Sequence, residues 1–293
     1  MRFTSIEVKR LFWRRPTGGQ LLWAIGIGSL LVALATFIFL AYRFSWDWTG
    51  FSQKRLFDWI QILVIPGAIA VGTFVLNRAA KKRDDLAQQE QREREQTIET
   101  ERAEEASLQA YLDYMSRMLT DSDRPLRRSH MGDNLSVAAR AHTLTVLARL
   151  EDGARKGSVI RFLYEANLIR GKYHPVINLS GANLGGANIQ FAALDGAILQ
   201  EANLAETNLG AANLKGAHLL LANLQRAHLG GANLQGANLQ GANLQGANLQ
   251  GANLQGADLR YAKGLTQDQI EQAIGDNYTT LPKGIDRPKS WCV

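Results

Sequence analysis

The sequence predicts a mixed fold, in which an N-terminal pair of membrane-spanning helices leads through a helical region to a C-terminal solenoid. Three observations carry this prediction: two long apolar runs, a polar stretch without proline or glycine, and an unbroken five-residue repeat. The expected order is a basic tail at 1–20, a transmembrane helical hairpin at 21–76, a polar helical stalk at 77–98, a small helical domain at 99–171, the repeats at 177–261, and a cap and tail at 262–293.

The two apolar runs are each long enough to cross a bilayer. Leu21 to Tyr42 has 22 residues without a charge, and Leu56 to Leu76 has 21 with Asp58 as the only charge. A helix needs roughly 20 apolar residues to span the hydrocarbon core. Asp58 and Gln61 raise the alternative of a transporter, but Asp58 stands in the first turn, where it can stay hydrated, so transport is disfavoured.

The net charge of +6 is confined to the N-terminal region. Residues 1–55 hold eight Lys/Arg against two acids, so the remaining residues sum to zero. A basic patch beside apolar runs favours membrane lipids as a partner over nucleic acid. Nine Lys/Arg flank the hairpin and three stand in its loop, which places both termini, and the repeats with them, in the cytoplasm.

The middle of the chain predicts helices. A polar helix is expected through the stalk and onward to Leu119. Its last part carries an apolar stripe at helical spacing, made of Leu108, Tyr111, Leu112, Met115, Met118 and Leu119. This stripe must be buried either within the following segment or against a partner helix. Two more helices are expected at about 135–150 and 156–168, and His130 and His142 lack a second ligand at metal spacing.

The repeat is the strongest pattern in the chain. Its centres recur every five residues, with Ala two places before most of them and Asn often one place before. A period of five would point leucines in every direction on an α-helix and to alternate faces on a strand. A chain that turns once per unit instead points every centre inward. The centres are Leu179, Leu184, Ile189, Leu194, Leu199, Leu204, Leu209, Leu214, Leu219, Leu224, Leu229, Leu234, Leu239, Leu244, Leu249, Leu254 and Leu259.

These units, which run as QGANL without variation from Gln235 to Gln255, resemble the pentapeptide-repeat family with its pattern A-(D/N)-L-x-x. The resemblance implies a right-handed quadrilateral β-helix with four units per coil. The segment RAHTLTVLARLEDGARKGSVIRFLYEANLI is similar to the region before the repeats in membrane-anchored bacterial members. An integral protein of a bacterial plasma membrane, or of a thylakoid membrane in a photosynthetic cell, is therefore expected. After the repeats, Thr266 and Gln269 predict a capping box that opens a short helix with Ile270 and Ile274.

Surface chemistry disfavours several functions. The best-known activity of the family is inhibition of DNA gyrase by mimicry of DNA, which requires an acidic rod. Residues 177–261 have a net charge of −1, from four acids and three bases. The sequence offers no catalytic, cofactor-binding or metal site, and His218 and His228 are expected on opposite faces of a coil.

A binding function is what remains. Units on one face lie twenty residues apart, which groups Ile198, His218, Leu220 and Leu221 into an apolar cluster. This cluster is either an interaction surface, a tolerated lapse in the repeat, or packing against the helical domain. Together with the stripe at Leu108, Tyr111, Leu112, Met115 and Met118, it predicts a membrane-tethered protein-binding scaffold or assembly factor. A regulatory or sensory adaptor is the alternative; the protein partner is an unidentified membrane or cytoplasmic protein, and a homo-oligomer stays open.

Overall fold

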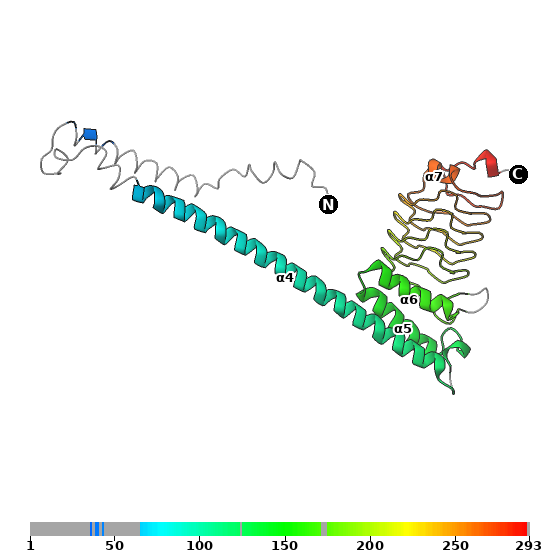
Figure 1. Ribbon diagram of the computed structural model, residues 1–293. Helices are drawn as coiled ribbons and strands as arrows, with labels where there is room; N and C mark the ends of the chain where they lie inside the picture. Colours follow the sequence, from blue (N-terminus) through cyan, green and yellow to red (C-terminus); the bar gives the residue numbers. More distant parts are fainter. Residues whose placement is uncertain are drawn as a thin grey trace. The chain divides into compact units, whose positions relative to one another are not determined.

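The computed structural model describes residues 36, 39, 40, 43, 65–123, 125–170 and 175–291 (Figure 1). The chain divides into two compact units, residues 1–91 and 92–293. The expected basic tail and the first apolar run lie outside the described residues, apart from Thr36, Phe39 and Leu40.

Helix α4 spans Ile65–Thr120 without interruption, so it begins in the first unit and continues into the second. The polar residues expected to form a stalk are therefore helical. From Ile65 to Leu76 the large apolar side chains are exposed, and the charged stretch follows from Arg78.

The expected membrane hairpin is contradicted by this structure. Among the helices formed by the described residues, none is long and apolar enough to cross a bilayer. The finding overturns the hairpin at 21–76, the integral membrane location, and the derived placement of both termini and the β-helix in the cytoplasm. Of the second expected span, residues 65–76 are described and form the start of α4, which continues as a charged helix. Residues 56–64 of that span lie outside the described residues.

The second unit begins with a small helical bundle. It contains the end of α4, a short 3₁₀ helix η3 at Leu126–Arg128, α5 at Asn134–Arg149 and α6 at Gly153–Glu165. Helix α6 starts where the Asp152 carboxylate accepts a hydrogen bond from the Arg155 amide at 2.7 Å. Such a bond satisfies an otherwise unpaired N–H of the first turn. The expected helices are thus present, with ends shifted by one to three residues.

The repeats form stacked coils in which each turn of the chain takes twenty residues. Parallel bridges join residues twenty apart, such as Asn183 to Asn203 and Asn203 to Asn223. The central Leu or Ile of every unit and most of the alanines two places before are fully buried. At each corner the amide of that alanine donates to the carbonyl of the preceding centre, as from Ala182 to Leu179 at 3.0 Å. Four units per coil, expected from the resemblance, are therefore what the structure has.

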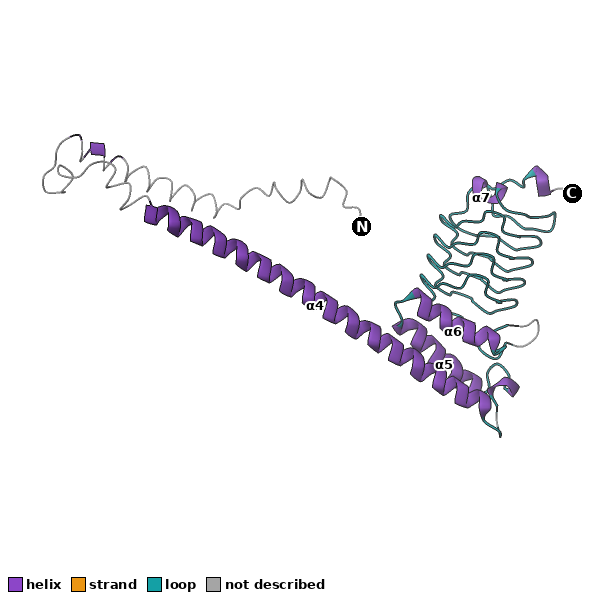
Figure 2. Ribbon diagram, in the orientation of Figure 1, coloured by secondary structure: helices purple, strands orange, loops and turns teal. Residues whose placement is uncertain are grey.

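The coils contain no extended strand among the described residues, which corrects one part of the expected β-helix. Each unit contributes a single isolated bridge residue, and Figure 2 shows the coils as loops and turns. Because the chain turns every five residues, too few consecutive residues pair with the next coil to make a strand. The result is a β-helical solenoid built from bridges and turns.

Both ends of the solenoid are covered (Figure 1). At the first coil, the Asn188 amide donates to the Gly153 carbonyl of α6 at 2.9 Å. At the last, α7 spans Gln267–Glu271 and opens with the predicted capping box of Thr266 and Gln269. Ile270 is buried there, whereas Ile274 lies past the helix end and is 52% exposed. Trp291, in the 3₁₀ helix η4 at Lys289–Trp291, is buried and donates to the Ala273 carbonyl at 3.1 Å.

Candidate functional site

The corners of the coils are where the solenoid varies most. The third residue of each corner turn has a positive φ, as in a type II turn, and glycine adopts this conformation at least cost. Seven of the 17 corners carry another residue. They are Phe191, Glu201, Glu206, Ala211, Leu221, Arg226 and Tyr261.

Three of these corner residues are large and apolar, and all three are exposed. Phe191 is 73% exposed, Leu221 52% and Tyr261 77%. A bulky side chain with positive φ is unusual, and left-handed backbone costs an L-residue about 1 kcal/mol or more. Folding gains little from side chains that remain in solvent, so these corners are the candidate recognition positions of the solenoid. The twenty-residue register puts Leu221 and Tyr261 on one corner column and Phe191 on the opposite one.

The predicted apolar cluster lies partly at these positions. Ile198 and His218 are joined by a parallel bridge, so the twenty-residue register does bring them side by side. Ile198 and Leu220 are partly buried, His218 is exposed, and Leu221 projects from its corner. The Leu221 side chain lies close to Gly241 of the next coil. A Cβ atom on Gly241 would be only 2.7 Å from Cδ2 of Leu221. A leucine fits at this corner because the corner above it is a glycine.

The charged corners are partly paired across coils. Arg226 lies 3.4 Å from Glu206, with both side chains mostly in solvent, so the pair adds little stability. Near the C-terminal end, the Arg260 guanidinium donates to the Asp258 carboxylate at 2.6 Å. This hydrogen bond is the main reason that the pKa of Asp258 falls to about 2.

One face between two corner columns is an asparagine ladder. Asn203 donates to Asn183 at 3.1 Å, Asn223 to Asn203 at 3.2 Å, and Asn243 to Asn223 at 3.4 Å. Several side-chain oxygens of the ladder also accept a backbone N–H two residues later, as Asn203 does from Ala205 at 3.2 Å. These amides are satisfied within the solenoid, which leaves a flat and regular polar face.

The predicted stripe on α4 faces the interior of the helical bundle. Leu108, Tyr111 and Met115 are buried, and Leu112 and Met118 are partly buried against the same core. The Tyr111 hydroxyl lies 3.0 Å from the Thr143 hydroxyl of α5, and burial raises the pKa of Tyr111. Of the two alternatives left open by the sequence, burial within the following segment is the one observed.

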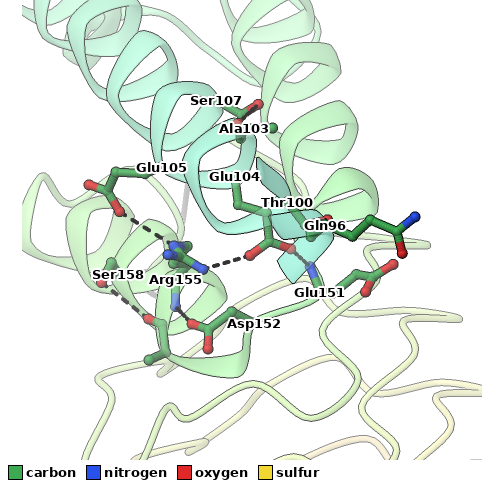
Figure 3. Close-up of polar contacts among 11 residues, drawn as sticks. Gln96, Thr100, Ala103, Glu104, Glu105, Ser107, Glu151, Asp152, Arg155 and Ser158 are labelled. Atoms are coloured by element: carbon green, nitrogen blue, oxygen red, sulfur yellow. Dashed lines mark hydrogen bonds and ion pairs between the residues drawn. The ribbon is translucent and has the colours of Figure 1, made fainter. Parts of the chain in front are cut away.

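A polar clamp joins α4 to the start of α6 (Figure 3). The buried Glu104 carboxylate accepts from Arg155 Nη1 at 2.8 Å and from the Glu151 amide at 2.5 Å. Glu105 also faces Arg155, at 3.4 Å. A buried carboxylate needs such partners, because an unpaired one would cost several kcal/mol.

Two basic side chains then join the bundle to the first coil. Arg140 of α5 donates to the Asn178 and Ser180 carbonyls, each at 2.9 Å. Lys156 of α6 is buried and donates to the Gly185 carbonyl at 2.9 Å, and this burial lowers its pKa. Carbonyls on the open edge of the first coil thus find donors in the helices, and the bundle acts as an N-terminal cap.

Sequence reasoning missed Phe191, Tyr261 and the donors of the cap. The available signal for the first two was the replacement of glycine at a corner, which the repeat alignment already shows. No comparable signal marks Arg140 or Lys156 as edge donors. The interaction role of the predicted cluster stays a prediction, and no group of His, Cys, Asp or Glu suited to a metal occurs in the part of the chain that the structure describes.

Comparisons with known proteins concern the solenoid. A family model described as pentapeptide repeats matches residues 177–216 and 222–261, in 8 copies. A pentapeptide repeat protein from Nostoc PCC 7120 is 38% identical over 37% of this chain and 77% of its own length, with a TM-score of 0.28. No catalytic family is indicated.

Two further solved structures have similar identity. HetL, a pentapeptide repeat protein of the same cyanobacterium involved in heterocyst differentiation regulation, is 33% identical over 39% of this chain and 56% of its own, with a TM-score of 0.24. A pentapeptide repeat protein of the Arabidopsis thaliana thylakoid lumen is 31% identical over 35% of this chain and 81% of its own, with a TM-score of 0.23. Among curated proteins, no significant match was found.

Proposed function

This chain belongs to the pentapeptide repeat family, and from that premise we propose that it is a non-enzymatic scaffold that binds a protein partner along the corners of its β-helix. The observation that carries the proposal is the distribution of side chains at left-handed corners. Six of the seven substituted corners lie between Phe191 and Arg226, and Tyr261 is the seventh. We therefore propose that the partner binds the part of the solenoid that precedes Gly231.

Glycine would have the lower backbone energy at these corners. Replacing a left-handed leucine or phenylalanine by glycine removes backbone strain of about 1 kcal/mol, and an exposed side chain offers little packing in return. Retaining Phe191 and Leu221 in solvent therefore serves something other than folding. Aromatic and large apolar side chains are the usual anchors of protein interfaces.

The repeats after Arg226 have mostly unsubstituted glycine corners. From Gly231 to Gly256 every corner is a glycine, and the faces between carry Asn and Gln. Such uniform faces offer a partner nothing to distinguish one coil from the next. Their contribution to the scaffold is a rigid spacer of fixed register.

The test exploits the glycine preference of the corners. Phe191→Gly combined with Leu221→Gly removes both apolar anchors and leaves the melting temperature of the full chain unchanged or slightly higher. We expect the proteins that co-purify with the tagged wild-type chain from its own cells to be lost with this variant. Ala211→Gly is the matched control, because it relaxes a corner with a φ of 52° but removes a single methyl group.

A coil deletion separates the two parts of the solenoid. Removing residues 235–254 takes out twenty residues, which is one full coil, and keeps the register of the remaining bridges. We expect the partner to be retained by this deletion. If the partner is lost on deletion of the coil and retained by the double glycine variant, the binding surface lies on the QGANL faces and the proposal is wrong.

A further inference from the structure

A second surface lies on the helical bundle, in a groove between α4 and α5. The groove has a volume of about 470 Å³ and an apolar floor that includes Ala106, Ala110 and Val146. On one wall the Tyr114 ring stacks on the His142 ring, with centroids 4.1 Å apart. A groove of this form, between two parallel-lying helices with small residues at its floor, fits a third helix.

The charged side chains that line the groove are basic. Arg117 and Arg149 line it, and no carboxylate does. Arg117 Nε donates to the backbone carbonyl of Asp113 at 3.3 Å. Within the described part of the chain, neither guanidinium forms an ion pair. The groove therefore favours a helix that carries acidic side chains.

We propose that the occupant is α4 of a second copy of this chain. The segment of α4 from Glu93 to Ala103 carries four glutamates against two arginines, a net charge of −2. Glu104 and Glu105, which follow it, already contact Arg155. All residues from Glu93 to Ala103 are exposed. The same protein thus holds both a basic groove for a helix and an exposed acidic helix.

The spacing of residues along α4 fixes an antiparallel arrangement. Glu99, Ala103, Ala106 and Ala110 are exposed and three or four residues apart, so they lie on one side of the helix, the side of the groove. With a two-fold axis beside Ala106, Ala103 of one copy faces Ala110 of the other. Glu99 then lies within one helical turn of Arg117 of the other copy.

The two-fold axis repeats this contact, so each dimer has two Glu99–Arg117 pairs. A parallel pair would place each Arg117 against its own counterpart, and like charges would repel. Small residues at the crossing let the two backbones come close. The contact uses only residues of the helical bundle, so it is independent of the corner surface of the solenoid.

Sedimentation of the full chain with charge-swapped variants tests the proposal. The wild-type chain should be dimeric at micromolar concentration and dissociate as salt is raised. Arg117→Glu and Glu99→Arg should each weaken the dimer about tenfold or more, because each change replaces two attractions by two repulsions. The double variant should dimerise again, and so should an equimolar mixture of the two single variants. Lys215→Glu, an exposed reversal on the solenoid, is the matched control and should have no effect.

A disulfide readout keeps the test independent of charge. In a Cys292→Ser background, Ala106→Cys should form a disulfide-linked dimer on mild oxidation, because the two residues meet at the axis. Ser116→Cys, exposed but turned away from the groove, should not. A wild-type chain that stays monomeric, a dimer that both single reversals leave intact, or equal cross-linking of the two cysteine variants would each overturn the proposal.

Discussion

The close contact between α6 and the first coil predicts that a glycine-to-alanine substitution in α6 destabilises the protein, although this substitution normally stabilises a helix. Gly157 lies so close to the solenoid that a Cβ atom at this position would overlap the Asn188 carbonyl oxygen. Ordinary contacts between carbon and carbonyl oxygen begin near 3.3 Å, so Gly157→Ala forces α6 outward by about 1 Å. The hydrogen bond from Asn188 to Gly153 and the bond from Lys156 to Gly185 both span the gap that would open.

The magnitude follows from three opposing effects. Alanine in place of glycine in a helix interior gains about 1 kcal/mol. Overpacking a close contact costs about 1–3 kcal/mol, and weakening two hydrogen bonds adds about 1 kcal/mol. The net expectation is a loss of about 2 kcal/mol in the free energy of unfolding.

Urea denaturation followed by far-ultraviolet circular dichroism measures this change. Ser158→Ala is the matched control, because Ser158 neighbours Gly157 on the same helix and is exposed. It should gain a few tenths of a kcal/mol through helix propensity. If Gly157→Ala stabilises the protein as the control does, then α6 is not seated on the coil, and its role as a cap is refuted.

Three further predictions concern single side chains. Leu249→Asp should lower the free energy of unfolding by several kcal/mol, and the adjacent Gln250→Asp by about 0.5 kcal/mol or less, because the first carboxylate is buried and unpaired and the second is exposed; equal losses in denaturation would contradict the inward placement of the centres. Since the pKa of Asp258 is lowered from 3.8 to about 2, its stabilising effect is complete above about pH 4 and lost as the pH falls through 2. Asp258→Asn should therefore be less stable than wild type at pH 6 and equally stable well below pH 2 in thermal melts, whereas a difference that persists there would exclude the ionised carboxylate as the cause. Glu104→Gln should lower the free energy of unfolding of the bundle by about 1–3 kcal/mol, because the buried side chain at position 104 then lacks the charge that binds Arg155. An unchanged midpoint of urea denaturation would show that the clamp is not needed.

The two apolar runs near the N-terminus show a limit of predictions from hydropathy. Length and hydropathy indicated two spans, yet the described part of the second run belongs to a long helix whose charged portion follows within a few turns. Hydropathy reports that side chains avoid water, and it does not report which helix they belong to or where that helix ends.

The interior of the solenoid follows from the amino-acid sequence alone. A strict period of five excludes a helix and a flat strand, and it is enough to assign Leu and Ala to the interior. Even the exception obeys this logic: Thr207 replaces an alanine, is buried, and donates its hydroxyl to the Leu184 carbonyl at 2.8 Å. Local chemistry was equally readable at the capping box of Thr266 and Gln269.

The partner of each buried face, in contrast, depends on how distant parts of the chain pack together. The apolar stripe that includes Leu108 and Met115 predicted that one side of α4 is covered, but it did not predict that α5 and α6 cover it. Likewise, Gly157 and Lys156 read as ordinary helix residues until the first coil lies against them. Periodicity is a property of neighbours along the chain, whereas the partner of a buried face is chosen by residues far away in the sequence.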